Sequence, residues 1–211
     1  MAKGESLLAV GEVVEGRFEI LKRIGAGPLG EVYQVQDNQG AVFALKILNA
    51  KIVPSFISLA KIQSAVIDQA PQIPGLVRPL EIIESGSSRY ILSNCVNGAD
   101  LGTIIQALAE TNRRLDSRAA SIILDKVLST LSGLPPMAVH GAIKPGNIIV
   151  EGVIPGTEIP EDAQIFITDF GTSRILSFSK YASVMLARGE DYQTIAPEFI
   201  SKGGRVERSA D

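Results

Sequence analysis

The side chains best suited to bind phosphate and a metal ion lie in two short polar turns. Lys144 and Asn147 occupy a Pro-Gly turn that leads directly into an apolar segment, and Asp169 directly follows the apolar segment 164–168. Carboxylate and amide oxygens bind Mg²⁺ together with phosphate oxygens, and a lysine can contact phosphate as a point charge. We therefore predict a Mg-phosphate site with Asn147 and Asp169 as metal ligands and Lys144 as a possible phosphate contact.

A glycine-rich segment is the second candidate for phosphate binding. Gly25, Gly27 and Gly30 form a G-x-G-x-x-G pattern, which is weak alone and in a dinucleotide-binding unit leads into a helix. Here residues 31–35 alternate as in a strand, and the turn residues 37–40 end it. We therefore expect a strand-loop-strand hairpin, and an ordinary glycine-rich hairpin without a phosphate ligand is the alternative.

Lys46 is a charged residue inside the apolar run 41–48. An ammonium flanked by core residues is costly to bury unless it meets an anion. We therefore predict that the Lys46 ammonium meets an anion. The alternative is a lysine that strand alternation directs to solvent.

Hydrophobic periodicity predicts the elements that hold these residues. The period-two pattern of 17–48 indicates three strands in a meander, and two more strands are expected at 77–83 and 90–94. A helix is expected from Pro54. Its apolar stripe is Phe56, Leu59, Ile62 and Val66.

Composition limits the classes of function. The 211 residues include 20 Lys or Arg and 23 Asp or Glu, so the net charge is −3 and there is no electrostatic case for nucleic acid binding. The single cysteine, Cys95, excludes an internal disulfide, and one cysteine with one histidine excludes a Cys/His zinc site. No apolar run reaches the roughly 18–20 residues of a membrane span. We expect a cytoplasmic protein.

Several short motifs follow one another in an order that resembles a protein kinase. The loop 140–147 resembles the kinase catalytic loop, and Asp169-Phe170-Gly171 resembles the DFG turn. Residues 93–98 resemble the hinge between kinase lobes, and Ala196-Pro197-Glu198 resembles the end of an activation segment. The loop that contains Lys144 resembles Ser/Thr rather than Tyr kinases, and the entry 16–20 is similar to bacterial Ser/Thr kinases in particular.

This resemblance implies an α+β, bilobal protein-kinase-like fold. A lead-in (1–16) would precede an N-lobe (17–94) with a five-stranded antiparallel sheet and one helix. Residues 95–211 would form the hinge and a partial, mainly helical C-lobe that ends before the central C-lobe helix.

The resemblance also implies ATP and Mg²⁺ as cofactors. Lys46 would contact phosphates, Asn94 and Val96 would present backbone groups to adenine, and Asn147 and Asp169 would hold the metal. The implied cofactor-binding residues are Ile24, Gly25, Gly27, Gly30, Val32, Ala44, Lys46, Asn94, Val96 and Ile149.

The sequence departs from the family in three respects. Ala142 stands where kinases carry the catalytic Asp, and Gly141 stands where many carry an Arg that receives the activation-loop phosphate. The helix positions that could supply an acid to Lys46, residues 62–64, are not acidic. Lys46 would then pair with Asp169, with a nucleotide phosphate, or with neither.

These departures leave three hypotheses. The first is a pseudokinase that binds Mg-ATP and regulates or scaffolds another protein. The second is a weakly active Ser/Thr kinase, because positioning and electrostatics supply much of phosphoryl transfer. The third is a protein-interaction domain that binds no nucleotide.

Overall fold

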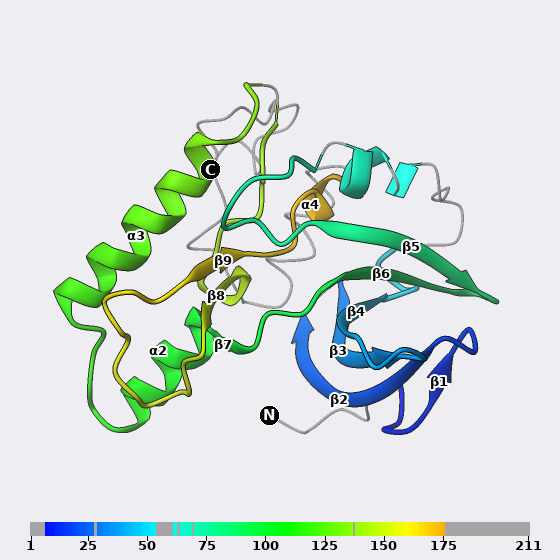
Figure 1. Cartoon of the computed structure of the whole chain (residues 1–211), viewed down its shortest axis with the longest axis horizontal. Coiled ribbons are helices and arrows are strands. Elements are labelled where there is room, and N and C mark those ends of the chain that lie inside the picture. Colours follow the sequence, from blue (N-terminus) through cyan, green and yellow to red (C-terminus); the bar gives the residue numbers. More distant parts are fainter. Residues whose placement is uncertain are drawn as a thin grey trace.

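A curled antiparallel sheet and a mainly helical region make up the described part of the chain (Figure 1). The structure is a computed structural model, and it describes residues 7–27, 29–53, 61–62, 64–68, 70–136 and 138–175. The predicted activation segment beyond residue 175, with its Ala196-Pro197-Glu198 motif, lies outside these residues, as do helix positions Phe56 and Leu59.

The larger sheet has six strands in the order β1-β2-β3-β4-β6-β5. They are β1 (Val13–Val14), β2 (Phe18–Gly27), β3 (Gly30–Asp37), β4 (Val42–Leu48), β5 (Pro79–Ser85) and β6 (Ser88–Asn94). The sequence predicted β2 to β6, but the five-strand count was wrong by one, because Val13 and Val14 pair with Glu19 and Phe18. Arg17, just before β2, reaches Glu81 of β5 at 2.9 Å, which shows how far the sheet curls.

Strand alternation separates the two faces of this sheet. The hydrophobic core takes alternate residues of β3 and β4, namely Tyr33, Val35, Leu45 and Ile47. The residues between them line a cleft on the other face, namely Val32, Gln34, Ala44 and Lys46. Lys46 therefore points away from the sheet's core, and its side chain is 11% exposed, so the solvent-facing alternative was wrong.

The segment that follows β4 is described only in part. Lys61 and Ile62 are helical, and η1 (Ser64–Asp68) is a π-helical turn. Ile62 and Val66 are fully buried, as their place in the predicted stripe requires.

A second, three-stranded sheet lies beside two helices (Figure 1). Its strands β7 (Gly98–Asp100), β8 (Ile148–Glu151) and β9 (Ile165–Ile167) are antiparallel. The short turn η2 (Pro145–Asn147) precedes β8, and the short helix α4 (Thr172–Ile175) follows β9. The division into 1–16, 17–94 and 95–211 stays a prediction.

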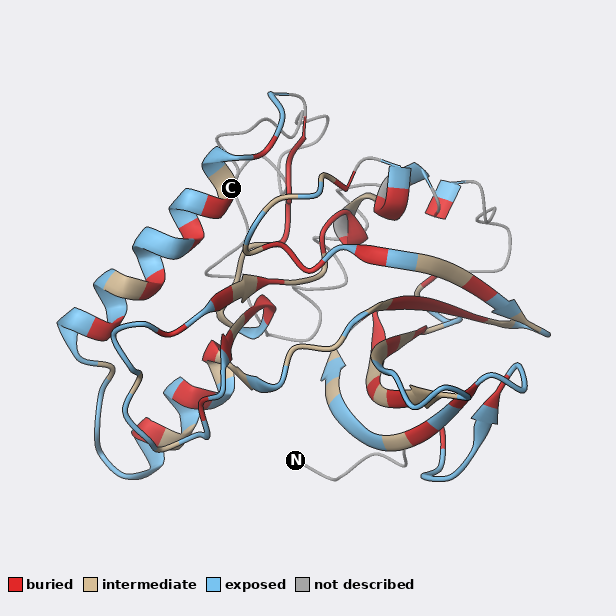
Figure 2. Cartoon of the chain, viewed as in Figure 1, coloured by how far each residue is buried: buried red, intermediate tan, exposed pale blue. Residues whose placement is uncertain are grey.

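Aspartates begin both longer helices. Asp100 Oδ1 accepts a hydrogen bond from the Thr103 N–H at 2.9 Å at the start of α2 (Leu101–Glu110). Asp116 does the same for Ala119 at 2.8 Å at the start of α3 (Ser117–Ser132). The helices bury their apolar stripes against the second sheet (Figure 2). Among the residues that the structure describes, no helix is long and apolar enough to span a membrane.

Candidate functional site

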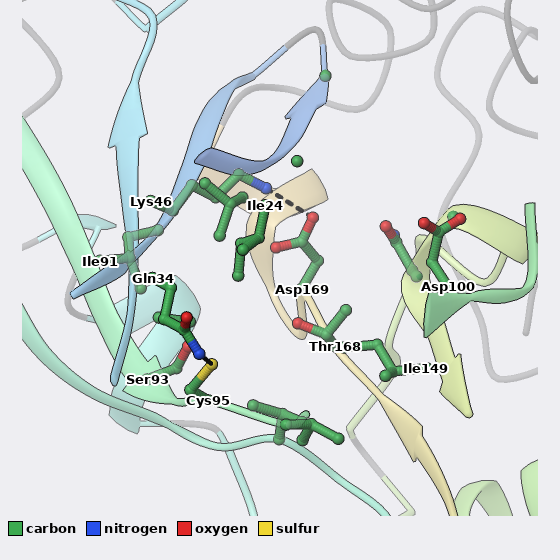
Figure 3. A pocket seen from close by; sticks show the side chains of 18 of the residues that line it. Ile24, Gln34, Lys46, Ile91, Ser93, Cys95, Asp100, Ile149, Thr168 and Asp169 are labelled. Carbon is green, nitrogen blue, oxygen red and sulfur yellow. Dashed lines mark hydrogen bonds and ion pairs between the residues drawn. The ribbon is translucent and has the colours of Figure 1, made fainter. Parts of the chain in front are cut away.

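A cleft of about 600 Å³ is lined by both regions of the fold (Figure 3). The curled sheet contributes β2, β3, β4 and β6, and the helical region contributes the residues around η2, β8 and the end of β9. All of the predicted cofactor-binding residues line it: Ile24, Gly25, Gly27, Gly30, Val32, Ala44, Lys46, Asn94, Val96 and Ile149. Lys144, Asn147 and Asp169 line the same cleft.

The glycine-rich segment forms the tip of the β2–β3 hairpin. Gly27 pairs with Gly30, and β3 continues from Gly30 as a strand, so the hairpin prediction is confirmed and the helix of a dinucleotide-binding unit is absent here. Gly30 has φ +153°, and a Cβ atom there would lie 1.8 Å from the Ile47 carbonyl oxygen. A side chain would therefore push β3 away from β4. At Gly27 a Cβ would meet nothing within 4 Å.

Lys46 and Asp169 form the central ion pair of the cleft. The Lys46 ammonium donates a hydrogen bond to Asp169 Oδ2 at 2.6 Å, and the two side chains are 11% and 24% exposed (Figure 3). Of the three outcomes left open for Lys46, pairing with Asp169 is the one observed. A charge-assisted bond of this length and burial is strong.

The surroundings of Asp169 stabilise its charged form. Burial alone would raise the pKa of the Asp169 carboxyl, but the charge and hydrogen bond of Lys46, with help from Lys144 and His140, hold that pKa below its usual value. The Asp169 backbone is left-handed, with φ +69°. Thr172 stabilises this turn, because its N–H and hydroxyl donate to the Asp169 carbonyl at 3.2 and 2.9 Å.

Asn147 is 5% exposed and held in one orientation. Its Nδ2 donates to the Ala142 carbonyl at 2.8 Å. Because the amide nitrogen is used, a cation would be bound by Oδ1. No group of three or more His, Cys, Asp or Glu side chains in the described residues is arranged to hold a metal. One carboxylate and one amide do fit a Mg²⁺ ion that phosphate oxygens help to bind.

Ala142 contributes a buried methyl group, 9% exposed, to the loop where a proton acceptor is expected. The carboxylates that line the described cleft are Asp100 and Asp169. Asp100 caps α2 and accepts from the Thr103 hydroxyl at 2.5 Å, and Asp169 pairs with Lys46. Within the described residues, both carboxylates of the cleft are therefore already engaged.

His140 packs against the turn that carries Asp169. It is fully buried, and its ring meets Phe170 edge-to-face with centroids 5.8 Å apart. Its Nε2 lies 3.0 Å from the Thr168 carbonyl oxygen. These contacts join the catalytic-type loop to the turn that carries Asp169.

Sequence reasoning overlooked Gln34 at the inner wall of the cleft. Gln34, Ala44 and Ser93 are cross-strand neighbours on β3, β4 and β6, and all line the cleft. Gln34 Nε2 donates to Cys95 Sγ at 3.5 Å (Figure 3). The signal was present, since Gln34 lies two residues after Val32 and so shares its face.

The described part of the segment after β4 supplies no acid to Lys46. In the described part of 61–68, Ile62 and Val66 are buried and the carboxylate, Asp68, is exposed. The acid that Lys46 contacts is Asp169 instead.

Comparisons with known proteins agree with this geometry. A family model described as the protein kinase domain matches residues 18–211. The chain is 27% identical over 202 residues to the serine/threonine-protein kinase PknA of Mycobacterium tuberculosis, covering 90% of this chain and 42% of that protein. It is 28% identical over 193 residues to human calcium/calmodulin-dependent protein kinase type 1B, covering 90% of this chain and 52% of that protein. The chain thus spans about half the length of these relatives, or less.

A solved structure shows the same fold. The kinase domain of Mycobacterium tuberculosis PknI superposes with a TM-score of 0.65 and 21% sequence identity, over 97% of this chain and 72% of that chain. The fold is that of a protein kinase, and the family model extends over nearly the whole sequence. The chain therefore belongs to the protein kinase domain family.

Proposed function

We propose that this chain is a pseudokinase: a kinase-fold module that binds Mg-ATP, lacks the catalytic base, and regulates or scaffolds another protein through its conformation. The observation that carries this proposal is the contrast within one site. Lys46, Asn147 and Asp169 line a single cleft. In contrast, the position where a kinase carries its proton acceptor is occupied by Ala142, whose methyl group cannot accept a proton.

In this proposal different cleft residues bind different parts of the nucleotide. The apolar side chains of Val32, Ala44 and Ile149 would enclose adenine, with the backbone at Asn94 and Val96 along its edge. The β2–β3 hairpin would cover the phosphates with backbone N–H groups. A bound Mg²⁺ would neutralise phosphate charge.

The phosphate and metal contacts fall to three side chains. Lys46 would exchange its contact with Asp169 for a phosphate, which frees the Asp169 carboxylate for the metal. Asn147 would offer Oδ1 to the same ion, since its nitrogen is bonded to the Ala142 carbonyl.

A weakly active Ser/Thr kinase is the second candidate. It is favoured by Lys144, which lines the cleft together with Asn147 and Asp169. These side chains can still position and charge-stabilise a phosphoryl group. Loss of the general base alone lowers a rate by roughly 10²–10⁴-fold, which leaves a residual activity to measure.

A thermal-shift titration with ATP, with and without Mg²⁺, tests nucleotide binding. Stabilisation follows RT ln(1 + [L]/Kd), so a hundredfold excess of ATP over its Kd contributes about 2.7 kcal/mol. We expect a Mg-dependent rise in Tm for the wild type and none for Lys46→Met. Lys22→Met is the control, because exposed Lys22 also lines the cleft. No shift at millimolar ATP would reject nucleotide binding and favour the protein-interaction domain.

A further inference from the structure

The segment before β1 is attached to the glycine-rich hairpin by a small polar cluster. We name residues 7–12 the N-terminal arm. The Leu7 N–H donates to Glu31 Oε2 at 3.1 Å, and the Leu8 N–H donates to the Tyr33 hydroxyl at 3.1 Å. The Tyr33 hydroxyl in turn donates to Glu31 Oε2. Two consecutive backbone amides of the arm are therefore bound by two side chains of β3.

Glu31 is the centre of this cluster. It is 15% exposed, and Arg23 of β2 donates to its Oε1 at 3.1 Å. Glu31 follows Gly30 directly and pairs across the hairpin with Ala26. Its neighbours Gly30 and Val32 line the cleft, so its own side chain extends from the opposite face of the same strand. The cluster thus binds the hairpin near its tip, on the face of the sheet opposite the cleft.

The arm itself is firmly anchored. Leu8 is 7% exposed and packs in the core of the curled sheet with Tyr33. Further along, the Gly11 N–H donates to the Ile20 carbonyl at 2.9 Å, and the Ile20 N–H donates to the Glu12 carbonyl at 2.8 Å. An anchored arm can hold the hairpin in place, whereas a frayed arm could not.

We propose that the N-terminal arm is a positioning element that holds the glycine-rich hairpin over the nucleotide site through Glu31 and Tyr33. This inference rests on the proposed function, because it takes Mg-ATP as the ligand of the cleft. The effect of the arm on the stability of the hairpin can nevertheless be measured without nucleotide. A change in the contacts of the N-terminal arm would therefore alter the position of the hairpin and, through it, nucleotide binding in the cleft.

Hydrogen exchange and ATP affinity test the proposal on four variants. Glu31→Ala removes the acceptor, Glu31→Gln keeps two hydrogen-bonding atoms, and Tyr33→Phe removes only the bridging hydroxyl. Deleting the arm is avoided, because buried Leu8 would also be lost. Glu81→Ala is the matched control: Glu81 binds Arg17 through both oxygens at 2.9 Å, on the same sheet but on β5.

Amide exchange at residues 25–27 and 30–33 of the nucleotide-free protein is the first measurement. Loss of one or two hydrogen bonds should make it about five- to tenfold faster in Glu31→Ala and in Tyr33→Phe, with Glu31→Gln between them and the wild type. Glu81→Ala should leave these amides unchanged. Equal exchange in Glu31→Ala and Glu81→Ala would overturn the proposal.

Calorimetric Kd values for Mg-ATP are the second measurement. We expect about three- to tenfold weaker binding for Glu31→Ala and wild-type affinity for Glu81→Ala. Faster exchange with an unchanged Kd would also overturn the positioning role. If the wild type binds no ATP, the proposed function fails, and the exchange data alone then decide whether the arm holds the hairpin.

Discussion

The ammonium of Lys46 lies 2.6 Å from the carboxylate of Asp169, although 123 residues separate them in sequence. β4 presents Lys46 on the face opposite its buried neighbours Leu45 and Ile47, and the turn after β9 presents Asp169. The pair joins the curled sheet to the helical region across the cleft. It also gives Lys46 a charged partner, since the described residues of the segment after β4 provide no acid to pair with it.

The Lys46–Asp169 pair should be strongly coupled in a double-mutant cycle. We expect Lys46→Met to lower the free energy of unfolding by about 1–3 kcal/mol, because the partly buried Asp169 carboxylate loses its partner. Urea unfolding of the single and double variants with Asp169→Asn should give a coupling of about 0.5–3 kcal/mol. The Arg17–Glu81 pair is the control, with side chains 49% and 40% exposed. A coupling no larger than that of this exposed pair would contradict the prediction.

The same pair should make stability depend on pH in one direction. Burial opposes the Asp169 charge, but Lys46 holds its pKa below the usual value of 3.8. A carboxyl whose pKa is lower in the folded chain stabilises it above the unfolded pKa, and this contribution is lost as pH falls through the folded pKa. The difference in unfolding free energy between wild type and Asp169→Asn should be constant from about pH 7 to 5 and shrink below about pH 4. A difference that grows on acidification would refute this.

Strand alternation made much of the site predictable. An apolar run around Lys46 and the alternation after Gly30 were enough to assign β3 and β4, and these strands bring Val32, Ala44 and Lys46 to the cleft. The same reasoning could have included Gln34, which shares a face with Val32.

Long-range partners were not predictable from single residues. Lys46 had two candidate partners, Asp169 and a nucleotide phosphate, or none, and the outcome depends on how β9 and β4 meet, which no local pattern encodes. β1 is only two residues long, too short for a periodic signal. The N-terminal arm has no periodicity either, so its contacts with Glu31 and Tyr33 emerge only from the packing of Leu8 in the core.

Gly30 and Gly27 should differ sharply in their tolerance of alanine. A Cβ at Gly30 would lie 1.8 Å from the Ile47 carbonyl oxygen, in a backbone with φ +153°, whereas one at Gly27 meets nothing within 4 Å. We expect Gly30→Ala to lower the free energy of unfolding by about 1–3 kcal/mol and to weaken ATP binding. Gly27→Ala, the matched control, should stay within about 0.5 kcal/mol of wild type. Equal loss in both variants would mean that crowding against β4 is not the cause.

Restoring an acid at position 142 tests whether the cleft is otherwise able to transfer phosphate. Ala142 lies in the loop that also carries Lys144 and Asn147, and its carbonyl already holds the Asn147 amide. Ala142→Asp should raise Mg-ATP phosphotransfer, measured as radiolabel incorporated into the protein or a Ser/Thr peptide, by roughly 10²–10⁴-fold over a near-background wild type. Ala142→Asn is the control, because it matches the added volume but accepts no proton at neutral pH. A wild type whose rate is well above background and equal to that of Ala142→Asp would show that the chain works without this base and would reject the pseudokinase proposal. A rate at background in both the wild type and Ala142→Asp would instead count against the weakly active kinase, because the remaining side chains would then not assemble a competent site.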